Sequence, residues 1–324
     1  MNKIVIKTIV LLALIVLSVS SIDLNLIARH INLNILLAII IVQPVVILSI
    51  MAAGKRLSIL SGIMGCTFVK FSTGFKATII SYGAGLLLPA RISEFLKPVY
   101  IRNQSKISLS AALSAVFLER VSDIVILGLF ACYGAIYFLE INLAKMLFLT
   151  GLLIASIYFS LIAEQSLIRL TKLIPSLIWR NFIIKIIQIC TQKLRQKSTY
   201  IAFSFGLIAW ALSFINVIIF LKFLGIDSIG MRGYIAIFLG STIGGAVPAL
   251  PGGFGAYEAS VVYILKSYGF GFDESLIIAL SLHISQLVFS VLGFMYLATF
   301  EKLGISSLMR EVGSLRQKKH IETR

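Results

Sequence analysis

The feature that most constrains this chain is its series of long apolar runs. A helix needs about 20 predominantly apolar residues to cross a lipid bilayer. Six segments meet this requirement, at residues 5–22, 34–52, 121–139, 144–163, 201–221 and 277–300. Because 59% of the chain is hydrophobic and only 13% is charged, it lacks the polar residues that cover a soluble fold. These features predict an all-α polytopic membrane protein and exclude an ordinary soluble domain.

The positive charge of the chain lies mainly between the apolar runs. The chain has 29 Lys and Arg against 13 Asp and Glu, a formal net charge of +16. The basic residues concentrate at 53–76, 91–106 and 164–198. Short cytoplasmic loops of membrane proteins are enriched in Lys and Arg, so these segments are predicted to be cytoplasmic. Both termini then lie on the cytoplasmic side of the cytoplasmic membrane, and nucleic acid is not the expected partner.

The domain organisation follows from the same pattern. Residues 1–300 are expected to form a single membrane domain, with a basic cytoplasmic tail at 301–324. Residues 165–198 alternate basic and apolar side chains. This pattern predicts an amphipathic helix that lies on the anionic lipids of the inner leaflet.

Two further apolar stretches, near 77–96 and 234–265, must each return to the side on which they began if the loop charges are consistent. The first is interrupted at Pro89-Ala90-Arg91 and the second between Pro248 and Gly255. Non-helical backbone at membrane depth survives only where protein or a water-filled cavity supplies hydrogen bonds, so both stretches are predicted to be re-entrant hairpins. Their entry from opposite sides indicates an inverted repeat with a binding site near the midplane.

Four acidic residues remain inside the predicted membrane segments after the loops and the tail are accounted for. They are Glu94, Glu119, Asp123 and Glu258. A charge at the bilayer centre costs about 2.5–3.5 kcal/mol, so an intramembrane carboxylate is a functional candidate by default.

The spacing of Glu119 and Asp123 places both carboxylates on one helix face, where they repel unless a cation lies between them. Arg120 is one candidate cation, and Arg91 or Arg102 from the first hairpin is another. A structural network of ion pairs is the alternative to a binding site here.

Arg91 and Glu94 follow the break at Pro89 and suggest a site for a phosphate-bearing headgroup, since guanidinium and helix N-terminal amides both favour phosphate. Lys97 and the basic residues after it are interpreted instead as positive-inside anchors of the hairpin.

Glycines cluster at the break in the second hairpin. Gly252, Gly253 and Gly255 permit positive φ and expose N–H groups at the start of the helix that leads to Glu258. Close helix packing by small residues is the competing explanation. His283 in the last span is interpreted as a satisfied interior histidine, with proton shuttling as the alternative.

Three motifs follow one another along the chain. They read Pro89-Ala-Arg91-Ile-Ser-Glu94-Phe-Leu-Lys97, Glu119-Arg120-Val-Ser-Asp123 and Pro251-Gly252-Gly253-Phe-Gly255-Ala-Tyr-Glu258-Ala259. In this order they resemble the motifs of the lysylphosphatidylglycerol synthase transmembrane region family, also described as flippase-like domain proteins. Ala90 and Ser93 stand where the family pattern has glycines, and Lys97 stands where it has arginine.

The resemblance implies a membrane region that moves a modified phospholipid between leaflets. The soluble aminoacyl-transferase domain of some members is not expected, because about 24 residues follow the last predicted span. Our hypothesis is therefore a flippase for an anionic phospholipid or a polyprenyl-phosphate-linked lipid. Alternatives are a membrane-embedded glycosyl- or headgroup transferase, or a non-transporting scaffold for a separate glycosyltransferase or lipid-modifying enzyme. No cofactor or metal site is predicted.

Overall fold

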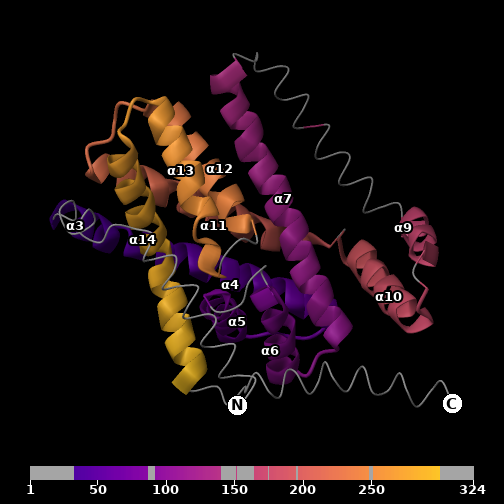
Figure 1. The fold of residues 1–324 in the computed structure, drawn as a ribbon. Helices are drawn as coiled ribbons and strands as arrows, with labels where there is room; N and C mark the ends of the chain where they lie inside the picture. The colour runs from indigo at the N-terminus through magenta and orange to yellow at the C-terminus, as the bar shows by residue number, and fades with distance from the viewer. Residues whose placement is uncertain are drawn as a thin grey trace, which may run out of the picture.

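The computed structural model describes residues 33–86, 92–139, 151, 164–173, 175–194, 196–247 and 251–299 (Figure 1). The described residues form helices and no strand, which confirms the all-α prediction. The α-helices are α3 (Leu33–Ile41), α4 (Gln43–Gly65), α5 (Phe71–Gly85), α6 (Leu96–Ser105), α7 (Leu109–Leu139), α9 (Glu164–Leu170), α10 (Leu177–Leu194), α11 (Lys197–Phe223), α12 (Gly230–Ala246), α13 (Ala256–Ser267) and α14 (Phe272–Thr299). Short 3₁₀ helices are η1 (Ile92–Phe95), η2 (Thr171–Leu173) and η3 (Pro251–Gly253).

Three helical stretches in the described residues are long and apolar enough to cross a membrane: Leu33–Gly65, Lys197–Phe223 and Phe272–Gly293. They correspond to three of the predicted spans. The predicted span at 121–139 lies within the longer helix α7. The spans predicted at 5–22 and, apart from residue 151, at 144–163 lie outside the described residues, as do Arg91 and the tail at 301–324.

The loop predicted at 53–76 is wrong for most of its length. Helix α4 continues to Gly65, where Cys66 ends it in a left-handed conformation with φ of 50°, and α5 begins at Phe71. Arg56 therefore lies inside a helix and is only 3% exposed. The helix continues past this charge because acidic side chains from α7 neutralise it.

Both interrupted stretches form pairs of packed helices. In the first, α5 packs against η1 and α6, and in the second α12 packs against α13. Figure 1 shows α12 and α13 in the upper part of the molecule and α5 and α6 in the lower part. The helical pairing agrees with the expected hairpins, while their re-entrant course through a bilayer stays a prediction.

The order of elements repeats along the chain. A long helix, a hairpin and a second long helix occur as α4, α5–α6 and α7, and again as α11, α12–α13 and α14. The two halves interlock, because α5 of the first hairpin packs on α14 and α12 of the second hairpin packs on α7. Helices α4 and α11 pack extensively on each other. This arrangement brings together the described ends of the two hairpin breaks, Leu86 after α5 and Pro251–Gly255 before α13, which we call the hairpin tips.

The segment predicted to lie on the inner leaflet is helical over most of its length. Helix α10 packs on α7 and buries Cys190 and Leu194, whereas Leu177 and Trp179 are exposed. Burial raises the pKa of the Cys190 thiol to about 12. The position of α10 at a membrane surface stays a prediction.

Helices α4 and α5 cross at two glycines that leave no room for side chains. A Cβ atom on Gly54 would lie 2.7 Å from Cα of Phe75, and one on Gly74 would lie 2.8 Å from the backbone nitrogen of Ser58. Both obstructing atoms belong to the backbone, so a side chain here forces the helices apart. This close approach holds Arg56, on α4, against the first hairpin.

We expect Gly74→Ala to lower the free energy of unfolding by about 1–3 kcal/mol, because overpacking shifts the backbone. The measurement is a titration of the purified protein with sodium dodecyl sulfate in mixed micelles. Gly85→Ala on the same helix is the matched control, since its Cβ would meet only Ser93 Oγ, at an ordinary 3.4 Å. Equal stability of the two variants would contradict the close approach.

Candidate functional site

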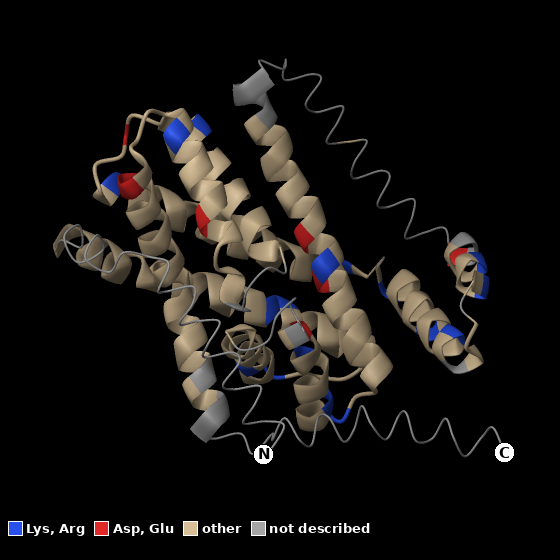
Figure 2. Ribbon diagram, in the orientation of Figure 1, with Lys and Arg blue, Asp and Glu red and all other residues tan. Residues whose placement is uncertain are grey.

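Six charged side chains meet inside the bundle and form what we call the ion-pair cluster. Its members are Arg56 from α4, Glu94 from η1, Lys97 from α6, and Glu119, Arg120 and Asp123 from α7. Figure 2 shows acidic and basic positions side by side on α7 and its neighbours in the middle of the molecule. Three cations face three carboxylates, so the cluster carries no net formal charge.

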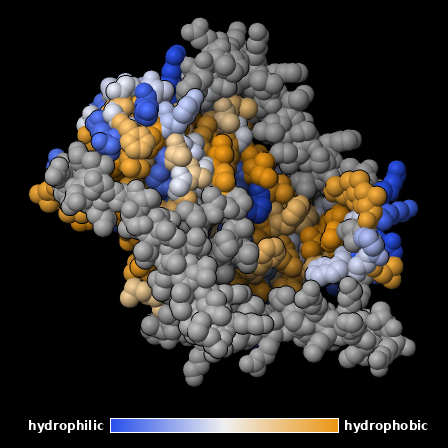
Figure 3. Space-filling model, in the orientation of Figure 1, coloured by the Kyte–Doolittle hydropathy of each residue, from blue (hydrophilic) through white to orange (hydrophobic). Residues whose placement is uncertain are grey.

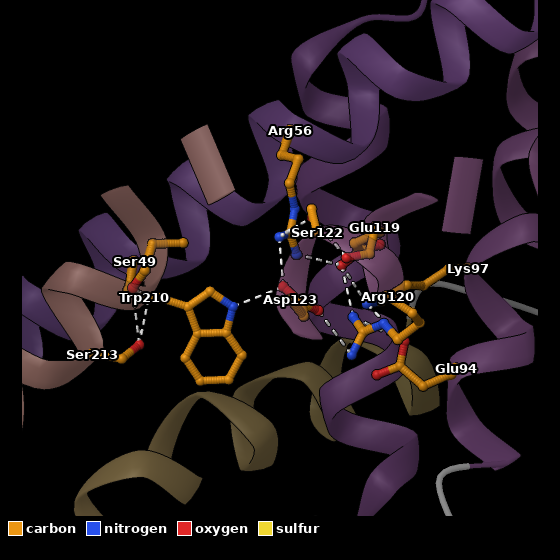
Figure 4. A network of polar contacts seen from close by, with 11 residues as sticks. Ser49, Arg56, Glu94, Lys97, Glu119, Arg120, Ser122, Asp123, Trp210 and Ser213 are labelled. Atoms are coloured by element: carbon orange, nitrogen blue, oxygen red, sulfur yellow. Dashed lines mark hydrogen bonds and ion pairs between the residues drawn. The ribbon is translucent and has the colours of Figure 1, made fainter. Parts of the chain in front are cut away.

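Glu119 is the centre of the ion-pair cluster (Figure 4). Its Oε1 atom lies 3.0 Å from Arg56 Nη2, 3.1 Å from Lys97 Nζ and 2.8 Å from Arg120 Nη2. The side chains of Arg56, Lys97 and Glu119 are only 3%, 1% and 2% exposed. Such buried charges are tolerated only when each is paired and hydrogen-bonded.

Asp123 links the ion-pair cluster to α11. Its Oδ1 accepts hydrogen bonds from Arg56 Nη1 at 2.6 Å and from the indole Nε1 of Trp210 at 2.7 Å. Its Oδ2 lies 3.2 Å from Arg120 Nη1. Ser122 Oγ accepts a further hydrogen bond from Arg56 Nη1. The carboxylate pair at 119 and 123 is therefore separated by cations, as the helical spacing requires.

Arg120 and Glu94 form the accessible edge of the ion-pair cluster. Their side chains are 33% and 20% exposed, far more than the other members. They are also joined by the longest ion pair of the cluster, 3.5 Å between Arg120 Nη2 and Glu94 Oε2. The second partner of Glu94 is Lys97, at 2.8 Å. These features make the Arg120–Glu94 pair the easiest to open.

A cavity of about 610 Å³ lies between the ion-pair cluster and the two hairpin tips. Its polar wall includes five members of the cluster, all but Lys97. Leu86 and Ser93 border it from the first hairpin, and Gly252 and Gly253 from the second. A Cβ on Gly252 would be 3.7 Å from Leu86 Cδ2, so the tips adjoin here. We call this space the central cavity.

The mouth of the central cavity is apolar. Ile124 on α7 and Ile243 and Val247 on α12 line it, and they are 62%, 65% and 46% exposed. Figure 3 shows a few hydrophilic atoms among hydrophobic ones in the middle of the face of the molecule that is in view. The central cavity therefore joins a charged interior to a surface suited to hydrocarbon.

A second polar group lies behind the tip of the second hairpin. Glu258 Oε2 accepts a hydrogen bond from the backbone N–H of Gly255 at 2.7 Å, and Glu258 Oε1 lies 2.6 Å from His283 Nδ1. His283 Nε2 lies 3.1 Å from the carbonyl oxygen of Gly252. The three glycines of this tip, at 252, 253 and 255, have φ values of 73°, 83° and 86°. The glycines are thus required for the backbone conformation of the tip, as predicted.

A smaller cavity of about 290 Å³ adjoins this second group, and we call it the inner cavity. Polar side chains line it, among them Asn216, Ser241, His283 and Gln286. It shares Trp210 and several further lining residues with the central cavity. The two cavities therefore adjoin, and Trp210 lines both.

The structure divides the predicted site residues between two places. Glu94, Glu119, Arg120 and Asp123 form one cluster and share the central cavity with Gly252 and Gly253. Gly255 and Glu258 instead belong to the group around His283. Arg91 lies outside the described residues.

Two cations of the ion-pair cluster are not predicted from the sequence. The loop charges place Arg56 in a loop and Lys97 at a surface anchor, yet both are buried. For Arg56 a signal was present, because the apolar sequence resumes after it and makes it an intramembrane charge. For Lys97 the local signal is its i, i+3 spacing from Glu94, which it contacts at 2.8 Å, whereas its other partner, Glu119, is distant in sequence. The sequence predicts His283 to be a satisfied interior histidine, and the structure places it against the hairpin tip, where it contacts the Gly252 carbonyl and Glu258.

Metal chemistry has no evident site in the described residues. No group of three or more His, Cys, Asp or Glu side chains in these segments is arranged to hold an ion. The carboxylates of the ion-pair cluster instead face arginine and lysine.

Comparison with protein families gives one match of high coverage. The family model described as the lysylphosphatidylglycerol synthase TM region matches residues 4–293. Comparison with curated proteins and with solved structures gives no significant match.

Proposed function

Because the chain belongs to the lysylphosphatidylglycerol synthase TM region family, we propose that it translocates a lipid with an anionic headgroup across the cytoplasmic membrane. The cargo is an anionic phospholipid or a polyprenyl-phosphate-linked lipid, and both termini are cytoplasmic. The observation that supports this function is the central cavity, which combines a charged wall with an apolar, exposed mouth.

A lipid headgroup and its tails need opposite surroundings, and the central cavity offers both. The headgroup enters the charged interior, while the acyl or prenyl chains stay in the bilayer beside Ile124, Ile243 and Val247. Placing the headgroup against protein charges replaces the water that it leaves, which lowers the cost of crossing the hydrocarbon core.

Arg120 is the residue that binds the headgroup in this proposal. Arg56 and Lys97 are almost fully buried, whereas the Arg120 guanidinium faces the central cavity in part. A phosphate displaces Glu94 from its 3.5 Å contact with Arg120, and Glu94 keeps its closer partner Lys97. Guanidinium binds phosphate with paired hydrogen bonds, so this exchange replaces a weak ion pair by a stronger contact.

The test is translocation of fluorescently labelled phosphatidylglycerol in proteoliposomes, followed by quenching of the outer-leaflet label with dithionite. We expect the quenched fraction to rise well above that of protein-free vesicles, because the protein exchanges label between leaflets. Unchanged quenching, with folded protein present, would contradict translocation of this lipid class. A labelled polyprenyl phosphate serves as the second probe, and mass spectrometry of both probes detects covalent products that would indicate a transferase instead.

A further inference from the structure

The contacts of His283 define how many protons the Glu258–His283 pair holds. The carbonyl oxygen of Gly252 only accepts hydrogen bonds, so His283 Nε2, 3.1 Å away, must be protonated to bond with it. The 2.6 Å contact between His283 Nδ1 and Glu258 Oε1 also needs a proton. That proton belongs either to an imidazolium or to a protonated carboxyl. In both cases the pair holds one proton more than a neutral histidine beside a carboxylate.

Loss of this proton breaks one of the two contacts. A neutral imidazole has one N–H group, which can face Glu258 or Gly252 but not both. The other ring nitrogen then presents its lone pair to an oxygen, and the two repel. Either loss affects the hairpin tip, because Gly252 belongs to the tip and Glu258 is bonded to it through the Gly255 N–H. The proton therefore holds the tip of the second hairpin to α14.

The surroundings of His283 contain few other groups that ionise. Tyr257 stacks on the imidazole with ring centroids 4.0 Å apart, and Phe254 lies at 4.8 Å. Aromatic faces favour a cationic imidazole. From α5, Tyr82 lines the inner cavity together with His283, whereas the residues contributed to this cavity by α4, α11 and α12 are not ionisable. No carboxylate is among the lining residues of the inner cavity in the described structure, and Glu258, which contacts His283 from α13, is the acidic partner of the imidazole.

The inner cavity adjoins this pair, because His283 lines it. Asn216, only 2% exposed, lines it, and neither its amide nitrogen nor its amide oxygen has a partner in the described residues. The inner cavity has a volume of about 290 Å³, which is sufficient for several waters at roughly 30 Å³ each. Water in this cavity would bond to Asn216 and lie between His283 and the lining residues, Trp210 among them, that the inner cavity shares with the central cavity.

We propose that Glu258 and His283 form a one-proton binding site that couples lipid translocation to the transmembrane proton gradient. This inference rests on the proposed function. Binding of the proton fixes the Gly252 tip beside Leu86 of the first hairpin, and its release frees the tip. The tip forms part of the central cavity, so proton binding and release alter the space in which the headgroup moves.

Glu258→Gln is the decisive variant, because glutamine imitates the protonated carboxyl. Its amide nitrogen can donate to His283 Nδ1, its oxygen can accept from Gly255 N–H, and His283 Nε2–H can still donate to Gly252. All the contacts form without a proton that dissociates. We therefore expect this variant to fold and to keep, at every pH, the conformation of the protonated Glu258–His283 pair.

The first measurement follows conformation without transport. The chain has two tryptophans, Trp179 and Trp210. The substitution Trp179→Phe leaves Trp210, which lines both cavities, as the single tryptophan. In this background we expect the Trp210 emission to change with pH, and the change to vanish in Glu258→Gln. His283→Gln should also abolish the change of Trp210 emission with pH. This variant replaces Glu258→Gln if Glu258→Gln fails to fold. Glu274→Gln, at an exposed position, is the matched control. Its Trp210 emission should change with pH as it does in the Trp179→Phe protein.

The second measurement uses the labelled phosphatidylglycerol assay with pH gradients of opposite sign. We expect the wild-type rate to differ at least threefold between the two gradients, and Glu258→Gln to show equal rates. Translocation by the wild type that ignores the gradient would overturn the coupling and leave the proposed function intact. Absence of translocation of both labelled phosphatidylglycerol and labelled polyprenyl phosphate, with a Glu258-dependent Trp210 titration, would overturn the proposed function and leave the proton site intact. Identical Trp210 titrations in wild type and Glu258→Gln would overturn the site.

Discussion

Replacing Glu119 by glutamine is expected to lower the free energy of unfolding by about 3–5 kcal/mol, the cost of removing one partner from a buried ion pair. Glutamine has nearly the shape of glutamate, so the loss comes from charge. Oε1 of Glu119 neutralises three cations at 2.8–3.1 Å. Its removal leaves Lys97, 1% exposed, with Glu94 alone and gives the ion-pair cluster a net positive charge.

A compensating change tests whether charge balance is the cause. Lys97→Met in the Glu119→Gln background restores equal numbers of cations and carboxylates, so the double variant should regain part of the lost stability. The measurement is unfolding in mixed micelles with sodium dodecyl sulfate, with the exposed Glu274→Gln as the matched control. Strict additivity of the two cluster substitutions would show that Lys97 and Glu119 do not interact.

Arg120→Gln is expected to reduce translocation of labelled phosphatidylglycerol by about 10- to 100-fold, since a hydrogen bond to a charged group contributes about 1.5–3 kcal/mol. Arg120 is the cation of the ion-pair cluster with the greatest exposure, 33%, and it lines the central cavity. The reduction should appear as a slower rate of label exchange in proteoliposomes that contain equal amounts of folded protein.

Folding must be separated from headgroup binding in this experiment, because Arg120 also pairs with Glu119 and Asp123. Arg120→Lys keeps the charge but loses the planar fork, and should give an intermediate rate with near-normal stability. Arg232→Gln, at an exposed position on α12, is the matched control and should behave as wild type. Wild-type exchange by folded Arg120→Gln would remove this residue from the site.

The elements of the fold were largely predictable because the bilayer restricts what can cross it. Apolar runs gave the helices at 34–52, 201–221 and 277–300, and proline and glycine marked the two hairpin breaks. Helix boundaries were less predictable. The charges at Lys55 and Arg56 indicated a loop, yet α4 continues through them because neutralisation by α7 makes a buried arginine acceptable.

The sequence by itself determined which carboxylates are exceptional, since a charge within an apolar run is costly wherever its partner lies. Glu94, Glu119 and Asp123 were identified in this way. Only the tertiary structure decided their partners. Arg56 lies 63 and 67 positions from the two acids of α7 that it contacts, and no periodicity links residues so far apart.

Glu258 shows the same division between what the sequence determines and what the tertiary structure decides. Its place beside the glycines was visible in the chain, and so was its cost in a membrane. Its separation from the ion-pair cluster and its contact with His283 depend on how α13 packs against α14. Local patterns determine where a charge must be satisfied, whereas the packing of distant helices determines which group satisfies it.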